Sequence, residues 1–276
     1  MSRKRSKRRI KKMVGYGAVG LVSVVLVVLI VLGLVQTPGG VDPLVKDPDV
    51  VIDGEGYDRR RELKHTLMIG VPDDESLGAQ YLTLITTDMT TKQYYFTNID
   101  YRIKTWIKPL NVRDNTANEQ GLIEAALGKA QTYGNGGQTS SWNTAEAIER
   151  MLDISITTVI CLHTTAGEAP MFQSAPATAL SNLLADIKSS VASTGKSFKV
   201  AVGDICVWSN FTSEKEFENL IEQLNSYACT PENPYTLGGT PVSEGLYEVD
   251  QKKLKELKTR LYLKKVEAET VVGGRS

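Results

Sequence analysis

The chain has 276 residues, with 32 lysines and arginines against 32 aspartates and glutamates. Eight of the basic residues and none of the acidic ones lie in residues 1–13, so residues 14–276 hold 24 basic and 32 acidic side chains, a net charge of −8. This sign excludes bulk attraction to nucleic acid, so we expect no nucleic-acid partner, and any anion site must be local.

A long apolar segment covers residues 14–35 (VGYGAVGLVSVVLVVLIVLGLV), which are 22 residues without a charge. As a helix it would reach about 33 Å, enough to cross a hydrocarbon core of ~30 Å. Positive charge stays on the cytoplasmic side of a membrane. We therefore predict a basic cytoplasmic tail at residues 1–13, a transmembrane helix at 14–35 and an extracytoplasmic remainder, in a single-pass protein of the cell membrane whose partner is the lipid bilayer.

A cleaved signal peptide is the alternative interpretation of the same segment. Its apolar run would be only ~7–15 residues long, and a small-residue cleavage site is missing from residues 36–38 (QTP). The sequence thus favours an anchor that is retained.

The region after the anchor is rich in proline and glycine. Residues 36–62 show no apolar period, which predicts a spacer between the membrane and a folded domain. The pattern changes at residue 63, and we expect one domain at residues 63–265 followed by a frayed C-terminus at 266–276.

Three buried strands open this domain, at residues 66–71 (TLMIGV), 81–86 (YLTLIT) and 93–99 (QYYFTNI). The turn at residues 88–92 is short, which predicts that the second and third strands form a hairpin. The polar stretch at residues 101–118 is a long loop, and such loops in compact domains are usually functional or mobile.

The middle of the domain is expected to alternate between helix and strand. We predict a helix over residues 119–133, a glycine-rich break at 134–137 and a short helix that a capping box at residues 143–146 (NTAE) opens. A buried strand follows at residues 156–162 (ITTVICL).

The last third continues the alternation of elements. It predicts a helix at residues 177–191 that Gly195 stops, strand-like segments at 199–202 and 205–207, a helix capped by Ser213 and a last helix capped by Asp250. Strands and helices that alternate in this way predict an α/β fold, with a mixed sheet flanked by helices and preceded by one transmembrane helix.

Cysteine and histidine are scarce. Cys161, Cys206 and Cys229 are too few for a disulfide framework, although Cys206 and Cys229 could form one bond. Cys161 lies in an apolar run and is expected in the core. The two histidines, His65 and His163, do not give a spacing typical of a metal site.

Three short segments of the domain resemble the LytR-CpsA-Psr (LCP) family. In that family the first strand leads into Gly-x-Asp, the second begins with Ser/Ala-Asp-Thr and the third ends in Ile-Pro-Arg-Asp-Thr. The corresponding places here are residues 70–73 (GVPD), 79–81 (AQY) and 99–102 (IDYR). Residues 147–163 (AIERMLDISITTVICLH) and 209–221 (SNFTSEKEFENLI) are also similar to the family, and the likeness extends from about residue 63 to 261.

The resemblance implies a role in cell-wall glycopolymer assembly in an envelope of Gram-positive type. Members are expected to transfer a glycopolymer from a polyprenyl-pyrophosphate lipid to peptidoglycan, with arginines on the pyrophosphate and an acidic residue on a divalent cation. For this sequence, the resemblance implies that Arg102 is the catalytic pyrophosphate ligand and that Mg²⁺ is a cofactor bound by Asp73 or Asp74. Two lysines and an arginine of the following loop, Lys104, Lys108 and Arg113, are further candidates for binding phosphate or lipid.

Each of these candidates has an ordinary structural alternative. Arg102 and the cations of the loop are also what an exposed, solubilising loop contains. Asp73 and Asp74 stand in a Pro-Asp-Asp-Glu run, which is typical of a solvated turn.

The sequence departs from the family at the positions that carry charge. The second-strand aspartate is Gln80, the residue after Val71 is Pro72, and the later helix at residues 183–196 contains lysines but no arginine. We therefore expect a pseudoenzyme that binds a polyprenyl-pyrophosphate lipid, an envelope glycopolymer or an envelope protein without transfer. The alternative is an active phosphotransferase.

Overall fold

The computed structural model describes residues 48–74, 77–109, 117–134, 137–164, 169–230 and 234–266. The predicted tail and anchor at residues 1–35 lie outside these ranges. No helix within the ranges is long and apolar enough to cross a membrane.

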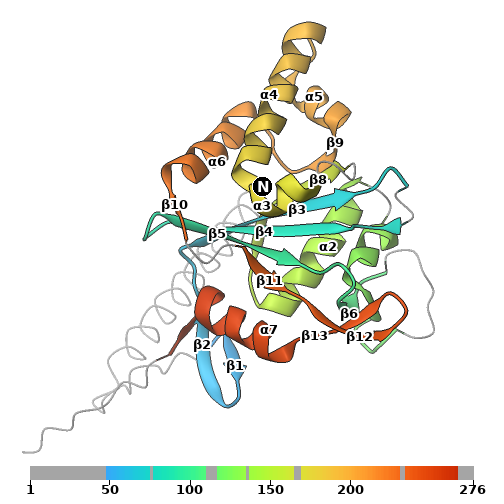
Figure 1. The fold of residues 1–276 in the computed structure, drawn as a ribbon, viewed down its shortest axis with the longest axis vertical. Helices are drawn as coiled ribbons and strands as arrows, with labels where there is room; N and C mark the ends of the chain where they lie inside the picture. Colours follow the sequence, from blue (N-terminus) through green and yellow to red (C-terminus); the bar gives the residue numbers. More distant parts are fainter. Residues whose placement is uncertain are drawn as a thin grey trace, which may run out of the picture. The chain divides into compact units, whose positions relative to one another are not determined.

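The centre of the domain is a seven-stranded sheet in the order β10-β5-β4-β3-β8-β9, with β11 also beside β5 (Figure 1). The strands are β3 (Leu63–Val71), β4 (Tyr81–Asp88), β5 (Gln93–Ile99), β8 (Ile156–His163), β9 (Cys206–Ser209), β10 (Ala228–Cys229) and β11 (Tyr235–Leu237). β3 pairs antiparallel with β4 and parallel with β8, so the sheet is mixed, as predicted. β4 and β5 form the predicted hairpin.

Both faces of the sheet are covered, because alternate residues of each strand point to opposite sides. On β3, Leu67 and Ile69 join one hydrophobic core, and Met68 joins the other. The first core receives side chains from α2 (Gly137–Leu152) and α7 (Gln251–Leu257), and the second from α4 (Pro176–Thr194), α5 (Phe198–Ile205) and α6 (Glu214–Ser226). α3 (Ala169–Ser174) also lies on the second side (Figure 1).

Part of the predicted spacer belongs to the folded domain. β1 (Val50–Ile52) and β2 (Glu55–Arg59) form a three-stranded sheet with β14 (Leu263–Lys265). The sequence does not reveal these strands because β2 pairs with a partner some 200 residues away, and their own pattern is weakly apolar.

Three helix and strand predictions in the domain are wrong. Residues 119–133 form β7 (Ile123–Ala126), which pairs with β6 (Lys104–Ile107), and the 3-10 helix Leu127–Tyr133. α2 begins at Gly137, so Asn143 is not a cap; inside the helix its Nδ2 donates to the Ala130 carbonyl at 3.0 Å. Residues 199–202 lie in helix α5.

The predicted helix ends are confirmed elsewhere. Gly195 ends α4 in the left-handed conformation at φ 68°. The Ser213 side chain accepts a hydrogen bond from the Glu216 N–H at 3.3 Å, and Asp250 accepts one from the Lys253 N–H at 3.0 Å. α7 continues into a π-helical turn at Lys258–Tyr262.

None of the three cysteines, which all lie in the described ranges, forms a disulfide. Cys161 is in the core, as predicted. Cys206 on β9 and Cys229 on β10 lie at opposite edges of the central sheet, so the topology excludes a bond between them.

Candidate functional site

The three segments that resemble the family meet at one end of the central sheet, which we call the motif end. β3 and β5 run in the same direction, and the register places Gly70 opposite Tyr81 and Leu82 opposite Ile99. The Gln80 N–H donates to the Gly70 carbonyl at 2.9 Å, which closes the link between β3 and β4.

A glycine completes the motif end. The Gly128 N–H donates to the Tyr101 carbonyl at 2.7 Å, and its own carbonyl accepts from the Ala79 N–H at 2.9 Å. A Cβ atom on Gly128 would lie 2.2 Å from the Ala79 carbonyl oxygen, so only glycine fits there. Through Gly128, the 3-10 helix therefore connects the segment before β4 and the segment after β5 by backbone hydrogen bonds.

Arg102 lies at this end, and its guanidinium group forms an ion pair with the nearby Asp100. The two carboxylate oxygens of Asp100 accept from Nε of Arg102 at 2.9 Å and from Nη2 at 2.8 Å, which is a two-pronged pair. Nη1 donates to the Tyr247 hydroxyl at 2.8 Å, and the guanidinium lies 4.0 Å from the centre of the Tyr247 ring. The Arg102 side chain is 38% exposed, so the group is reachable from solvent although its charge is paired.

Both members of this pair are held in their charged forms. Burial alone would raise the pKa of Asp100, but the hydrogen bonds from Arg102 outweigh it and lower that pKa. The hydrogen bond to Asp100 raises the pKa of Arg102. A phosphate that binds Arg102 must therefore compete with a fixed carboxylate.

Among the predicted cations of the following loop, Lys104 is paired with carboxylates. Nζ of Lys104 lies 3.3 Å from a carboxylate oxygen of Glu248 and 3.6 Å from one of Glu124, and the hydrogen bond to Glu248 raises its pKa. Lys108 is exposed, and Arg113 lies outside the described residues. Lys104, on β6, thus forms ion pairs with β7 and with β13 (Leu246–Val249). β13 pairs with β12 (Gly239–Ser243).

Asp73 and Asp74 are exposed in the turn after β3. The Asp74 carbonyl accepts from the Leu77 N–H at 3.1 Å, as a solvated turn requires. No group of three His, Cys, Asp or Glu side chains that could hold a metal ion occurs in the part of the chain that the structure describes. Mg²⁺ uses one or two carboxylates with water and phosphate oxygens, so a site on Asp73 and Asp74 stays a prediction.

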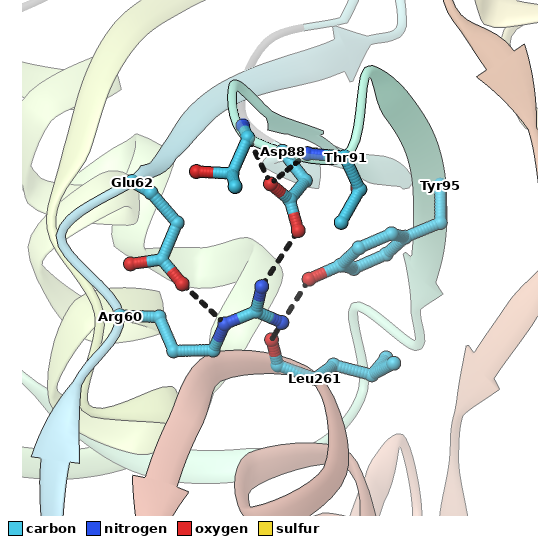
Figure 2. A network of polar contacts seen from close by, with 7 residues as sticks. Arg60, Glu62, Asp88, Thr91, Tyr95 and Leu261 are labelled. Carbon is cyan, nitrogen blue, oxygen red and sulfur yellow. Dashed lines mark hydrogen bonds and ion pairs between the residues drawn. The ribbon is translucent and has the colours of Figure 1, made fainter.

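A second polar cluster, which sequence analysis missed, lies at the opposite end of the sheet and is centred on Arg60 (Figure 2). Arg60 donates from Nε to Glu62 at 2.8 Å and from Nη2 to Asp88 at 2.6 Å. Its Nη1 donates to the Leu261 carbonyl at 3.2 Å, which also accepts from the Tyr95 hydroxyl at 2.9 Å. Arg60 therefore ties together the β2–β3 link, the β4–β5 turn and the C-terminal turn.

A cavity of about 380 Å³ adjoins this cluster. Its lining includes the three consecutive arginines Arg59, Arg60 and Arg61, together with His65 and Tyr262. The sequence signal that could have found it is the Arg-Arg-Arg run at residues 59–61, which ends two residues before the buried strand β3 begins.

Comparisons with known proteins gave matches only among solved structures. No protein-family model matches the chain, and no curated protein matches it. Protein gbs0355 from Streptococcus agalactiae is 16% identical over 71% of this chain and 86% of its own, with a TM-score of 0.46. TagU of B. subtilis is 15% identical over 72% and 94%, with a TM-score of 0.45.

A third similar structure is the LytR-CPS2A-psr family protein YwtF (TagT) with bound octaprenyl pyrophosphate lipid. It is 14% identical over 72% of this chain and 88% of its own, with a TM-score of 0.40. The family of this third structure is the one that residues 70–73, 79–81 and 99–102 resemble.

Proposed function

We propose that this chain is a membrane-anchored LCP-like protein of cell-envelope glycopolymer assembly that binds a polyprenyl-pyrophosphate lipid without transferring its polymer. The resemblance of residues 70–73, 79–81 and 99–102 to the family supports the proposal, because these separate segments meet at the motif end. The chemistry of that end then favours binding over transfer.

The observation that carries this conclusion is the pair between Arg102 and Asp100. Phosphoryl transfer depends on fixed positive charge that faces the charge developing in the transition state. Asp100 accepts two hydrogen bonds from Arg102 and neutralises it, so the guanidinium has only its remaining N–H groups for a phosphate oxygen. Such a site holds a phosphate weakly and stabilises little additional charge.

The surrounding residues support the same conclusion. Gln80 is neutral where the family has an aspartate, and Lys104 lies between two glutamates. An envelope glycopolymer or an envelope protein remains a further partner under this proposal, and the bilayer holds the chain through residues 14–35. Protease added to intact protoplasts should digest the domain and spare the tail; a protected domain would contradict this topology.

An active phosphotransferase is the second candidate. The 38% exposure of Arg102 favours it, together with the exposed carboxylates Asp73 and Asp74, which follow β3 at the same end. This activity would require Asp100 to release Arg102 when the pyrophosphate arrives.

Calorimetry on the full chain in nanodiscs tests the binding proposal, with a short polyprenyl pyrophosphate as the probe. We expect binding that persists without Mg²⁺ and weakens about tenfold in Arg102→Ala, because one charge-assisted contact is lost and Asp100 is left to repel the ligand. Arg102→Lys is the matched control and should lie between the two, since it keeps the charge without the fork geometry. Equal affinity in wild type and Arg102→Ala would reject the assignment of Arg102.

A further inference from the structure

The cavity at the Arg60 end is part of a longer groove. A neighbouring hollow of about 360 Å³ shares Arg59, Asp153, Ile154 and Ser155 with it, so the two adjoin. The cavity opens where β3 and β8 begin, at the end of the sheet opposite Arg102. Its volume of about 380 Å³ is within the range of ~300–1,000 Å³ that is usual for small-molecule sites.

Two of the arginines that line the groove form no close pair through their side chains, although Arg59 is near enough to Glu149 to favour the charged form of that carboxyl. Arg60 is engaged by Glu62, Asp88 and the Leu261 carbonyl. The side chains of Arg59 and Arg61 are exposed and form neither a hydrogen bond nor an ion pair within the described ranges. The groove therefore offers two guanidinium groups in addition to that of Arg60.

The groove also holds carboxylates, which limits the kinds of ligand. Asp153 is paired with Lys258, and an Asp49 oxygen accepts from the Arg59 N–H at 3.0 Å. Both carboxylates line the same cavity, and carboxylate oxygens accept hydrogen bonds from hydroxyl groups. A bare anion would be repelled by them, whereas a ligand that carries hydroxyl groups as well as an anion would satisfy both kinds of group.

His65 provides a buried polar group in the cavity wall. It is 4% exposed, and its Nδ1 is 3.0 Å from the Thr86 hydroxyl oxygen. Its other ring nitrogen has no hydrogen-bond partner among the residues that the structure describes, and the ring packs edge-on against Tyr262 at 5.5 Å. Burial lowers the pKa of His65 to about 4, so the ring is neutral and its second nitrogen can form one hydrogen bond to a hydroxyl group.

We propose that this groove is a second ligand site, which takes a phosphorylated sugar with its phosphate on Arg59 and Arg61 and its hydroxyl groups toward Asp49, Asp153 and His65. The phosphate oxygens can accept paired hydrogen bonds from the guanidinium groups, and the sugar hydroxyl groups can donate to the carboxylates and the His65 ring. The ligand is either a free sugar phosphate or a unit of a phosphate-bearing glycan. The site is independent of the proposed binding at Arg102, since the two lie at opposite ends of the sheet.

Calorimetry on the full chain in detergent micelles tests the site, with glucose 6-phosphate as the probe and glucose and inorganic phosphate as the partial ligands. We expect glucose 6-phosphate to bind more tightly than either, and Arg59→Ala and Arg61→Ala each to weaken it about tenfold. Lys215→Ala, which removes an exposed cation of α6 outside the groove, is the matched control and should leave this affinity unchanged. Ser155→Trp, at an exposed position in the groove, should block binding without lowering the melting temperature.

Phosphorylated dextran, with plain dextran as its control, distinguishes the two sources. Binding of the polymer at least as tight per site as that of glucose 6-phosphate would identify a glycan unit, and binding of the monosaccharide alone would identify a free sugar phosphate. Binding that survives both Arg59→Ala and Ser155→Trp, that disappears in Lys215→Ala, or that no phosphorylated probe shows, would overturn the proposal. None of these results depends on whether a polyprenyl pyrophosphate binds at Arg102.

Discussion

At the scale of single residues, the outcome at Arg102 depends on Asp100. The sequence has an arginine near the position expected from the family. It does not show that the carboxylate two residues earlier accepts hydrogen bonds from two nitrogens of that guanidinium. The contact from Tyr247 comes from a strand some 145 residues away, and local patterns carry no information about it. The candidate site could therefore be located from sequence, whereas its charge balance could not.

Releasing Arg102 from its carboxylate should increase its affinity for phosphate. In Asp100→Asn the amide oxygen can still accept the Arg102 N–H, which is 3.0 Å from Oδ1, but the competing negative charge is removed. We expect affinity for inorganic pyrophosphate, measured by calorimetry, to rise about tenfold. The gain should vanish in the double variant with Arg102→Ala, and a gain that persists there would place the anion elsewhere.

The buried His65 should make stability depend on pH. Its pKa is about 4 in the folded chain and near 6.5 when unfolded, so below pH 6.5 the unfolded chain binds a proton that the native state does not. The free energy of unfolding should therefore fall as the pH drops from 6.5, by about 2 kcal/mol at pH 5.

Urea unfolding of the full chain across pH 5–7 measures this dependence, and His65→Gln is the control. The variant keeps a polar side chain but has no group that titrates in this range, so its slope should be flatter by that amount. Parallel slopes for the two proteins would contradict the assignment to His65.

At the scale of elements, patterns within one segment were informative and pairings across the chain were not. The β4–β5 hairpin and the caps at Ser213 and Asp250 are local, and the sequence predicts them correctly. β7 was mistaken for a helix because its partner β6 lies across a long loop, and β2 was missed because β14 is at the other end of the domain. The contacts of Arg60 with Asp88 and Leu261 likewise join residues that are distant in sequence.

The Arg60 cluster should therefore contribute to stability as a junction between elements. Arg60→Ala would leave the Asp88 side chain, which is 6% exposed, with the backbone N–H groups of Thr90 and Thr91 but without its cationic partner. An uncompensated charge in such a position costs about 3 kcal/mol of unfolding free energy. Arg61→Ala is the adjacent control and should change it by no more than ~0.5 kcal/mol, because that side chain is exposed and unbonded. Chemical denaturation compares the two, and equal losses would show that the network does not act as a junction.

At the scale of the whole domain, the packing is complete, but the charged groups expected for phosphoryl transfer are not available. The domain has a mixed sheet with a hydrophobic core on each face, and Gly128 packs closely against the backbone at the motif end. The charged groups expected for transfer are paired, replaced or exposed in this domain. A well-packed scaffold with neutralised charges fits a protein that holds an envelope ligand rather than one that transforms it.

A single-turnover transfer assay tests this account most directly. The full chain in nanodiscs is loaded with a labelled glycopolymer on a polyprenyl-pyrophosphate carrier and mixed with peptidoglycan and Mg²⁺. The account predicts that the carrier is bound, with affinity reduced in Arg102→Ala, while no label moves to peptidoglycan. Label on peptidoglycan from wild type, lost in Arg102→Ala, would contradict it and establish the chain as a transferase.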